Sequence, residues 1–181
     1  MSSNNITCNV FQQILLPCKD NIGGIKNAWI TDFEHFGYTV TTSSIGASDY
    51  NTIVTFATSS GSTGIYQITP ARTSGNTTED QVVDTTNTLW KQVVTLVYPK
   101  NQASIRNFVQ SLGKSTIVCI VQDRNNLFWA YGTDNGLQVS TKHQTGTVES
   151  DKNTWTFGFE GTEAYPALPV SAATMLPFIV V

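Results

Sequence analysis

The stretch LFWAYGTDNGLQV, residues 127 to 139, sets aromatic residues and an Asp-Asn-Gly run side by side. Period-two alternation divides its first six residues between two faces of a strand: Phe128, Ala130 and Gly132 on one, Leu127, Trp129 and Tyr131 on the other. Asp, Asn and Gly tolerate the positive φ angles that tight hairpin turns require. The stretch therefore predicts a hairpin turning at residues 134–136, with a core on one side and sheet or subunit packing on the other, and not a ligand site.

The same alternation recurs along the chain. TWTFGFEG (154–161) places Trp155, Phe157 and Phe159 on one face, which indicates a half-buried strand. WKQVVTLVY (90–98) and TIVCIVQD (116–123) are rich in β-branched residues and favour more deeply buried strands. Shorter candidates are AWITDF (28–33), NTIVTFAT (51–58) and GIYQITP (64–70). We expect at least seven strands.

One segment, NQASIRNFVQSLGKS (101–115), predicts a helix. Its apolar residues Ile105, Phe108, Val109 and Leu112 form one stripe. Asn101 or Ser104 is expected to cap its start, and Gly113 to take the left-handed conformation at its end. A single amphipathic helix among strands must bury its stripe against a sheet. The predicted fold is mainly β: a β-sandwich or partly closed β-barrel with one flanking helix at about 102–113.

The length fits one domain, residues 1–181, with two unusual segments. Residues 71–89 are polar around Val82 and Val83, and we expect a long loop that is disordered or ordered by a partner. VSAATMLPFIVV (170–181) is apolar. Its end, residues 171–181, is either a last strand or an arm that docks on another subunit.

The composition excludes several classes of protein. Hydrophobic residues make up 40% of the chain and aromatic residues 10%, so the chain is not wholly disordered. Charged residues are only 13%, and the net charge is −3. The composition therefore gives no excess of basic residues for binding the phosphates of nucleic acid. A surface of uncharged polar groups costs less to desolvate against a neighbour, which favours subunit contacts.

The cysteines and the two terminal segments give little indication of function. An odd count without a CxxC pair, namely Cys8, Cys18 and Cys119, argues against a disulfide framework and a zinc site. MSSNNITCNVF shows no secretory signal, and MLPFIVV is too short to span a bilayer. We expect folding in a reducing compartment, and no membrane partner.

No catalytic, cofactor-binding or metal-binding residue is predicted. His35 lies between aromatic residues and is expected in a loop or strand end, and His143 is expected to be solvated. Burial in a strand would leave Cys119 inert. Asp123, Asp134 and Asp151 are explained by turns. A distant carboxylate pair meeting in the fold remains open, but an enzyme is not the favoured class.

A carbohydrate-binding β-sandwich is the main alternative. Sugar stacking needs exposed aromatic side chains. Trp90, Trp129 and Trp155 lie in strand-like runs, where burial is the commoner fate. Trp29 and Tyr131 are then the candidates for a stacking surface.

Several segments together resemble the tail-tube-like virion proteins of tailed bacteriophages of Bacteroidota, crAss-like phages included. GGIKNAWITDF (23–33) is similar to their opening strand, and TIVCIVQDRNNLFWAYGTDNGLQV (116–139) to their hairpin. Between these two segments lie a strand, KQVVTLVYPK, and a helix, ASIRNFVQSLGKS, and after them come TGTVESDKN and the closing strand TWTFGFEGTEAYPALPV; this order is also similar. The resemblance covers residues 23–33 and about 90–170. Residues 40–89 and the MLPFIVV tail do not follow it.

The resemblance implies a non-enzymatic structural subunit of a phage tail, either a tail tube or a tail/neck ring protein. Such proteins form closed homo-oligomeric rings whose joined sheets line a channel for DNA. Implied partners are further copies of the chain, adjacent tail or portal/neck proteins, and DNA in sequence-independent transit. The implied location is the virion, assembled in the bacterial cytoplasm. The expected subunit-interface residues are Thr77, Glu79, Asp80, Val82, Val83, Met175, Phe178 and Ile179.

Overall fold

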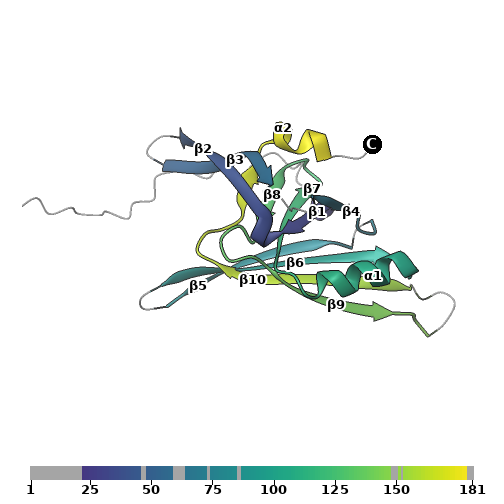
Figure 1. Ribbon diagram of the computed structural model, residues 1–181. Coiled ribbons are helices and arrows are strands. Elements are labelled where there is room, and N and C mark those ends of the chain that lie inside the picture. The colour runs from purple at the N-terminus through teal and green to yellow at the C-terminus, as the bar shows by residue number, and fades with distance from the viewer. Residues whose placement is uncertain are drawn as a thin grey trace, which may run out of the picture.

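The computed structural model describes residues 22–45, 48–58, 64–72, 74–84, 87–147, 151 and 153–178. Two β-sheets face each other, one strongly curled and one long (Figure 1). The curled sheet has seven strands: β1 (Ile25–Asp32), β2 (Phe36–Ile45), β3 (Ser48–Thr58), β4 (Tyr66–Ile68), β7 (Ile117–Asp123), β8 (Phe128–Tyr131) and β11 (Leu168–Val170). Their spatial order is β2-β3-β11-β8-β7-β1-β4.

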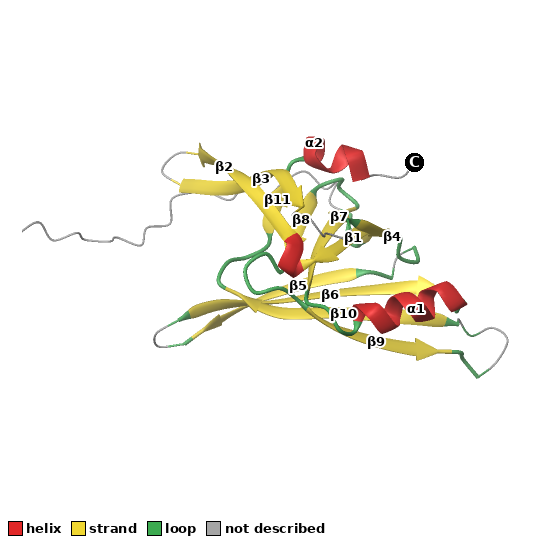
Figure 2. Cartoon of the chain, viewed as in Figure 1, coloured by secondary structure: helices red, strands yellow, loops and turns green. Residues whose placement is uncertain are grey.

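The long sheet has four antiparallel strands in the order β5-β6-β10-β9. They are β5 (Asn76–Val83), β6 (Thr88–Pro99), β9 (Gln138–Gln144) and β10 (Thr154–Glu163). Helix α1 (Ala103–Leu112) lies at one end of this sheet, and α2 (Ala172–Met175) lies over the curled sheet (Figure 2). Two short 3-10 turns are η1 (Phe33–His35) and η2 (Leu176–Phe178).

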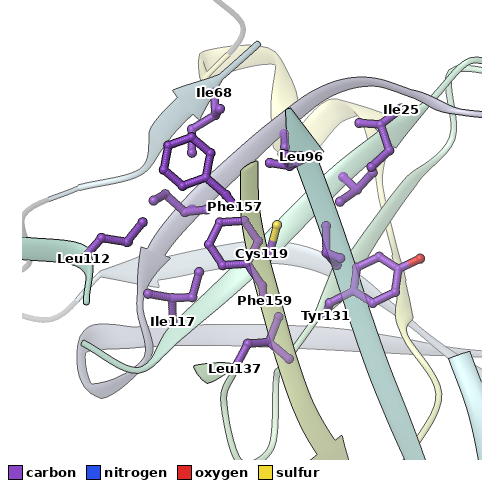
Figure 3. Packing of buried hydrophobic residues seen from close by; sticks show 14 of the residues in the cluster. Ile25, Ile68, Leu96, Leu112, Ile117, Cys119, Tyr131, Leu137, Phe157 and Phe159 are labelled. Atoms are coloured by element: carbon purple, nitrogen blue, oxygen red, sulfur yellow. The ribbon is translucent and has the colours of Figure 1, made fainter. Parts of the chain in front are cut away.

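The main core fills the space between the sheets and receives the apolar stripe of α1. Figure 3 shows the rings of Phe157 and Phe159 of β10 close to Cys119 of β7, and Tyr131 of β8 belongs to the same cluster. A second cluster on the opposite face of the curled sheet includes Trp29, Ile53, Ile120 and Met175. Strand β7 therefore contributes to both clusters, which explains its continuous apolar run. The predicted fold, a mainly β sandwich or partial barrel with a helix at about 102–113, is confirmed.

The predicted division of faces is confirmed for residues 128–131, whereas Leu127 lies outside β8 and is 54% exposed. Trp129 and Tyr131 pack with the main core, whereas Phe128 and Ala130 belong to the second cluster. The predicted hairpin at residues 134–136 is wrong. Strand β8 lies in the curled sheet and β9 in the long sheet, so residues 132–137 carry the chain from one sheet to the other.

Positive φ angles do occur in this crossover, +74° at Gly132 and +76° at Gly136. These two glycines lie where the chain passes from one sheet to the other, and not in a two-residue turn. The hairpin of this region lies one step earlier, between β7 and β8. There an Asp123 carboxylate oxygen accepts the Leu127 amide at 2.8 Å, and Asn126 has a φ of 64°.

The expected ends of the helix need correction. Gln102 occupies the N-cap position, and no side chain caps the helix there, so neither Asn101 nor Ser104 has that role. Gly113 is right-handed, with φ −66° and ψ −3°, and its amide donates to the Val109 carbonyl at 3.0 Å. The helix thus ends through its own backbone and not through a left-handed glycine.

The polar segment 71–89 is not a long loop. It contains β5, which pairs with β6 from Asn76 opposite Thr95 to Val83 opposite Thr88. Backbone hydrogen bonds hold this strand, and these bonds do not depend on an apolar side-chain pattern.

The C-terminal segment packs on its own chain and is neither a last strand nor a free arm. Met175 is fully buried in the second cluster. The Trp29 indole donates to the Phe178 carbonyl at 2.9 Å, and the Thr174 hydroxyl donates to the Val54 carbonyl at 2.6 Å. The last strand is β11. Ile179 lies outside the described residues.

Candidate assembly surface

The long sheet turns one face away from the core, and we call this its outer face. Alternation along the strands places mainly hydroxyl and amide side chains there, among them Thr78, Thr95, Ser140, Thr154 and Thr156. A shallow hollow of about 330 Å³ lies on this face. Gly158 allows the close approach of the strands there, since a Cβ on it would lie 2.6 Å from the Ser140 hydroxyl oxygen.

Charges on the outer face balance. Asp80 and Glu160 are its acids, and Lys91 and Lys142 its bases. Lys91 Nζ and Glu160 Oε1 form an ion pair at 2.6 Å. Hydrogen bonding and attraction to Glu160, with a smaller effect of Asp80, raise the pKa of Lys91. The face therefore offers hydrogen bonds without an excess of either charge.

The two edges of the long sheet, β5 and β9, pair with no further described strand. Because four antiparallel strands alternate in direction, β5 and β9 run in opposite directions. A copy rotated about an axis along the strands would bring its β9 antiparallel to this β5. Each exposed edge is a template for pairing with another chain.

The structure separates the residues predicted to form a subunit interface. Asp80 lies on the outer face, and Val82 and Val83 lie near the tip of the β5–β6 hairpin with 50% and 69% exposure. Met175 and Phe178 pack in the second cluster, on the far face of the curled sheet. Met175 is thus unavailable to a neighbouring subunit in this conformation.

Thr77 and Glu79 point inward. Thr77 hydrogen-bonds the Tyr131 side chain. A Glu79 carboxylate oxygen accepts the Ala167 amide at 2.7 Å, and desolvation by burial raises the pKa of Glu79. Both side chains anchor the edge strand to its own chain.

Sequence reasoning missed two buried polar residues beneath the crossover. Gln92 accepts the Gly132 amide at 2.9 Å and donates to the Tyr165 carbonyl at 3.1 Å. The Glu163 carboxylate accepts the amides of Asp134 at 2.8 Å and Asn135 at 3.1 Å. Alternation continued along the two strands would have found both, since it places these polar side chains at core positions.

The residues considered for chemistry remain apart. His35 Nδ1 lies 3.7 Å from Asp32 Oδ2 at an exposed turn, and His143 Nε2 lies 2.9 Å from Asn153 Oδ1. Cys119 is fully buried, and burial raises the pKa of its thiol well above the usual range. Within the described residues, no group of three or more His, Cys, Asp and Glu side chains is placed to hold a metal.

The aromatic residues proposed for sugar stacking are buried. Trp29 has no exposed surface and Tyr131 only 5%, and desolvation raises the pKa of Tyr131 to about 12. Trp155 is buried, as expected, while Trp90 and Trp129 are half-buried. Neither predicted stacking residue can therefore meet a sugar.

Among the helices of the described residues, none has the length and hydropathy to cross a membrane. Comparisons of the chain with protein-family models, with curated proteins and with solved structures found no match.

Proposed function

We propose that this chain is a non-enzymatic structural subunit of a phage tail, forming a tail tube or a tail/neck ring. The observation that supports this most directly is the long sheet, whose two edges run in opposite directions and pair with no other strand among the described residues. Copies related by rotation join β5 of one to β9 of the next, and all strands of the ring remain antiparallel. The resemblance of residues 23–33 and about 90–170 to tail-tube-like proteins supports the same reading.

In this proposal the outer face lines the channel. Its hydroxyl groups and balanced charges give DNA few phosphate contacts, so DNA passes without adhering. The core side of the sheet stays buried against the curled sheet. Adjacent tail or portal/neck proteins would stack on the ring, and the virion would be the location.

Charge reversal at the edges tests the seam between subunits. Edge strand β5 carries Glu79 and Asp80, and edge strand β9 carries Lys142. Purified wild-type protein should form rings or tubes in negative-stain micrographs. Lys142→Glu places acids on both edges and should abolish rings, and Asp80→Lys combined with it should restore them.

Lys114→Glu, on an exposed site after α1, is the matched control and should leave rings intact. A protein that stays monomeric at every concentration, with and without neighbouring tail proteins, would contradict the proposal. The position of the gene among portal, capsid and tail genes is an independent check. A hydrolytic activity lost in His35→Ala or Cys119→Ala would overturn the non-enzymatic assignment.

A further inference from the structure

The main core opens at one end of the sandwich into a hollow of about 270 Å³. The start of β1, the end of β7, strand β8 and the start of β5 border it, so both sheets contribute to its walls. We call it the β7–β8 hollow. Ligands often bind in the mouths of β-barrels, and sites for small molecules begin at about 300 Å³. The hollow is therefore of a size for a ligand of about one ring.

Aromatic and apolar side chains of the main core form the floor of the hollow. Val121 and Trp129 are paired across β7 and β8, and Tyr131 follows on the same face. Tyr131 is only 5% exposed, and its side chain hydrogen-bonds Thr77, so it closes the floor. Trp129 is half-buried. Trp129 is therefore the aromatic residue of this lining that keeps surface for a ligand.

Hydrogen-bonding groups border this floor. Asp123 ends β7, two residues after Val121, so it lies on the same face of the strand. Asp123 Oδ1 accepts the Leu127 amide at 2.8 Å, which orients the carboxylate, while Oδ2 makes no hydrogen bond to a described residue. Asn125 borders the hollow too, and its Oδ1 accepts the Ile22 amide at 3.0 Å. The hollow thus has a positioned acceptor, Asp123 Oδ2, that its own chain does not use.

The chemistry of the lining selects one class of ligand. Among the described residues that line the hollow, Asp123 carries the one charge, and there is no Lys or Arg. A phosphate or carboxylate group would meet repulsion from Asp123, and a wholly apolar ligand would desolvate that carboxylate without a partner. A neutral sugar ring has a face of C–H groups and an edge of hydroxyl donors. It therefore matches both the indole and the carboxylate.

Arg124 lies beside the hollow without lining it. Its Nε atom is adjacent to Gly24, is buried, and has no hydrogen-bond partner within the described part of the chain. Because a guanidinium group attracts carboxylates, a comparison of a neutral with an acidic sugar belongs in the test.

We propose that the β7–β8 hollow binds one ring of a neutral sugar, with Trp129 packed on its C–H face and Asp123 Oδ2 accepting from its hydroxyl groups. The site goes beyond the proposed structural role and does not depend on it. Thr77 borders the hollow from the core side of β5, whereas the proposed channel lies along the outer face of the same sheet. In a ring the site would recur in every subunit, so several weak sites would hold one polysaccharide together.

Ligand-detected NMR on the full chain tests the site, with D-glucose, D-galactose and N-acetyl-D-glucosamine as probes. At least one probe should show saturation transfer, with a Kd on the order of 1 mM. Asp123→Asn keeps an Oδ1 acceptor for the Leu127 amide but replaces Oδ2 with a donor group. Trp129→Phe reduces the aromatic surface. Each variant should weaken binding about tenfold or more.

A third variant fills the hollow without removing a core side chain. An added Cβ at Gly23 would have nothing within 4 Å, so Gly23→Leu places its side chain at the border of the hollow without a clash. It should also weaken binding, while urea denaturation should show unchanged stability. This variant keeps the test decisive if Trp129→Phe disturbs the core.

Asp32→Asn is the matched control and should bind sugar as wild type does. Asp32 Oδ1 also accepts a backbone amide, that of Glu34 at 3.1 Å, but Asp32 lies at the opposite end of β1. Glucuronate should bind more weakly than glucose, because its carboxylate approaches Asp123.

Three results would overturn the proposal: no binding of any probe at about 100 mM, equal binding by wild type and all three hollow variants, or a preference for glucuronate. Ring formation is read separately in micrographs, and Asp123→Asn should still form rings. Sugar binding by a chain that never forms rings would contradict the proposed function alone. Rings without sugar binding would contradict the sugar site alone.

Discussion

At the scale of single residues, the crossover between the sheets depends on Glu163. Only 1% of this residue is exposed, and its carboxylate accepts the backbone amides of Asp134 and Asn135. Backbone donors in a buried loop need such an acceptor. The side chain therefore replaces the hydrogen bonds that a regular strand would supply.

Glu163→Ala should lower the free energy of unfolding by about 2–3 kcal/mol, since it leaves buried amides without an acceptor. Urea denaturation measures this. Glu160→Ala, on the same strand but with an exposed side chain paired to Lys91, should cost about 0–1 kcal/mol. Equal costs for the two variants would show that the crossover does not need its buried carboxylate.

The charge of Glu163 adds a dependence on pH. Burial raises the pKa of Glu163, although the amides of Asp134 and Asn135 act in the opposite direction. Because the pKa is higher in the folded state, folding favours the protonated form. The contribution of Glu163 to stability should grow as pH falls through the folded-state pKa, and level off below the unfolded value of 4.5.

Glu163→Gln, which cannot titrate, is the reference for that effect. The difference in unfolding free energy between wild type and Glu163→Gln should increase from pH 7 to pH 4.5. Glu79, whose pKa is also raised, is present in both proteins and cancels in the difference. A difference that shrinks over this interval would mean that the amide donors outweigh burial.

At the scale of elements, strands were predictable where their side chains alternate or form apolar runs. Strands β6, β7 and β10 have such patterns because one or both faces lie in a core. Strand β5 has none, since it is a sheet edge with mostly exposed side chains held by backbone pairing. The hairpin predicted at residues 134–136 is wrong for a related reason. A glycine-containing connection has the same sequence pattern whether the chain returns to its own sheet or passes to another sheet.

The two glycines that the sequence treated alike should respond differently to alanine. Gly136 has a φ of +76°, and a Cβ there would overlap the Thr116 methyl and the Phe33 ring. Gly136→Ala should cost about 1–3 kcal/mol. Gly113 is right-handed with only ordinary contact near a Cβ, so Gly113→Ala should change stability by less than about 1 kcal/mol. Thermal unfolding compares them, and a larger loss at Gly113 would contradict the assigned conformations.

At the scale of the whole molecule, the two sheets differ in which of their faces are buried. In the curled sheet, strands β1, β7 and β8 contribute side chains on one face to the main core and on the other face to the second cluster under α2. The long sheet has one buried face and one polar outer face, and within the described part of the chain its two edges have no pairing strand. Sequence patterns indicated the polar surface, but not which face carried it, because that depends on which strands share a sheet. The composition therefore predicted a polar surface, but the strand order of the long sheet was needed to identify the residues that form it.

If the outer face lines a channel, added positive charge there should make the channel bind DNA. Thr95 and Thr156 border the hollow on that face. Thr95→Lys with Thr156→Lys should leave rings intact, yet retain double-stranded DNA in 50 mM salt and release it by 200 mM. Each phosphate contact should contribute a slope of about −0.9 to a plot of log K against log salt.

The control places the same charges elsewhere: Tyr165→Lys with Leu176→Lys, at side chains 65% and 68% exposed. Lysines on the outer face would all contact the same DNA molecule threaded through the ring. The outer-face variant should therefore retain linear DNA. Its DNA binding should also depend more steeply on salt concentration than that of the control. Closing the ends of the DNA before ring assembly should prevent threading and weaken retention by the outer-face variant alone. Equal retention by both variants, whatever the state of the DNA ends, would remove the outer face from the channel and leave it as an ordinary polar surface.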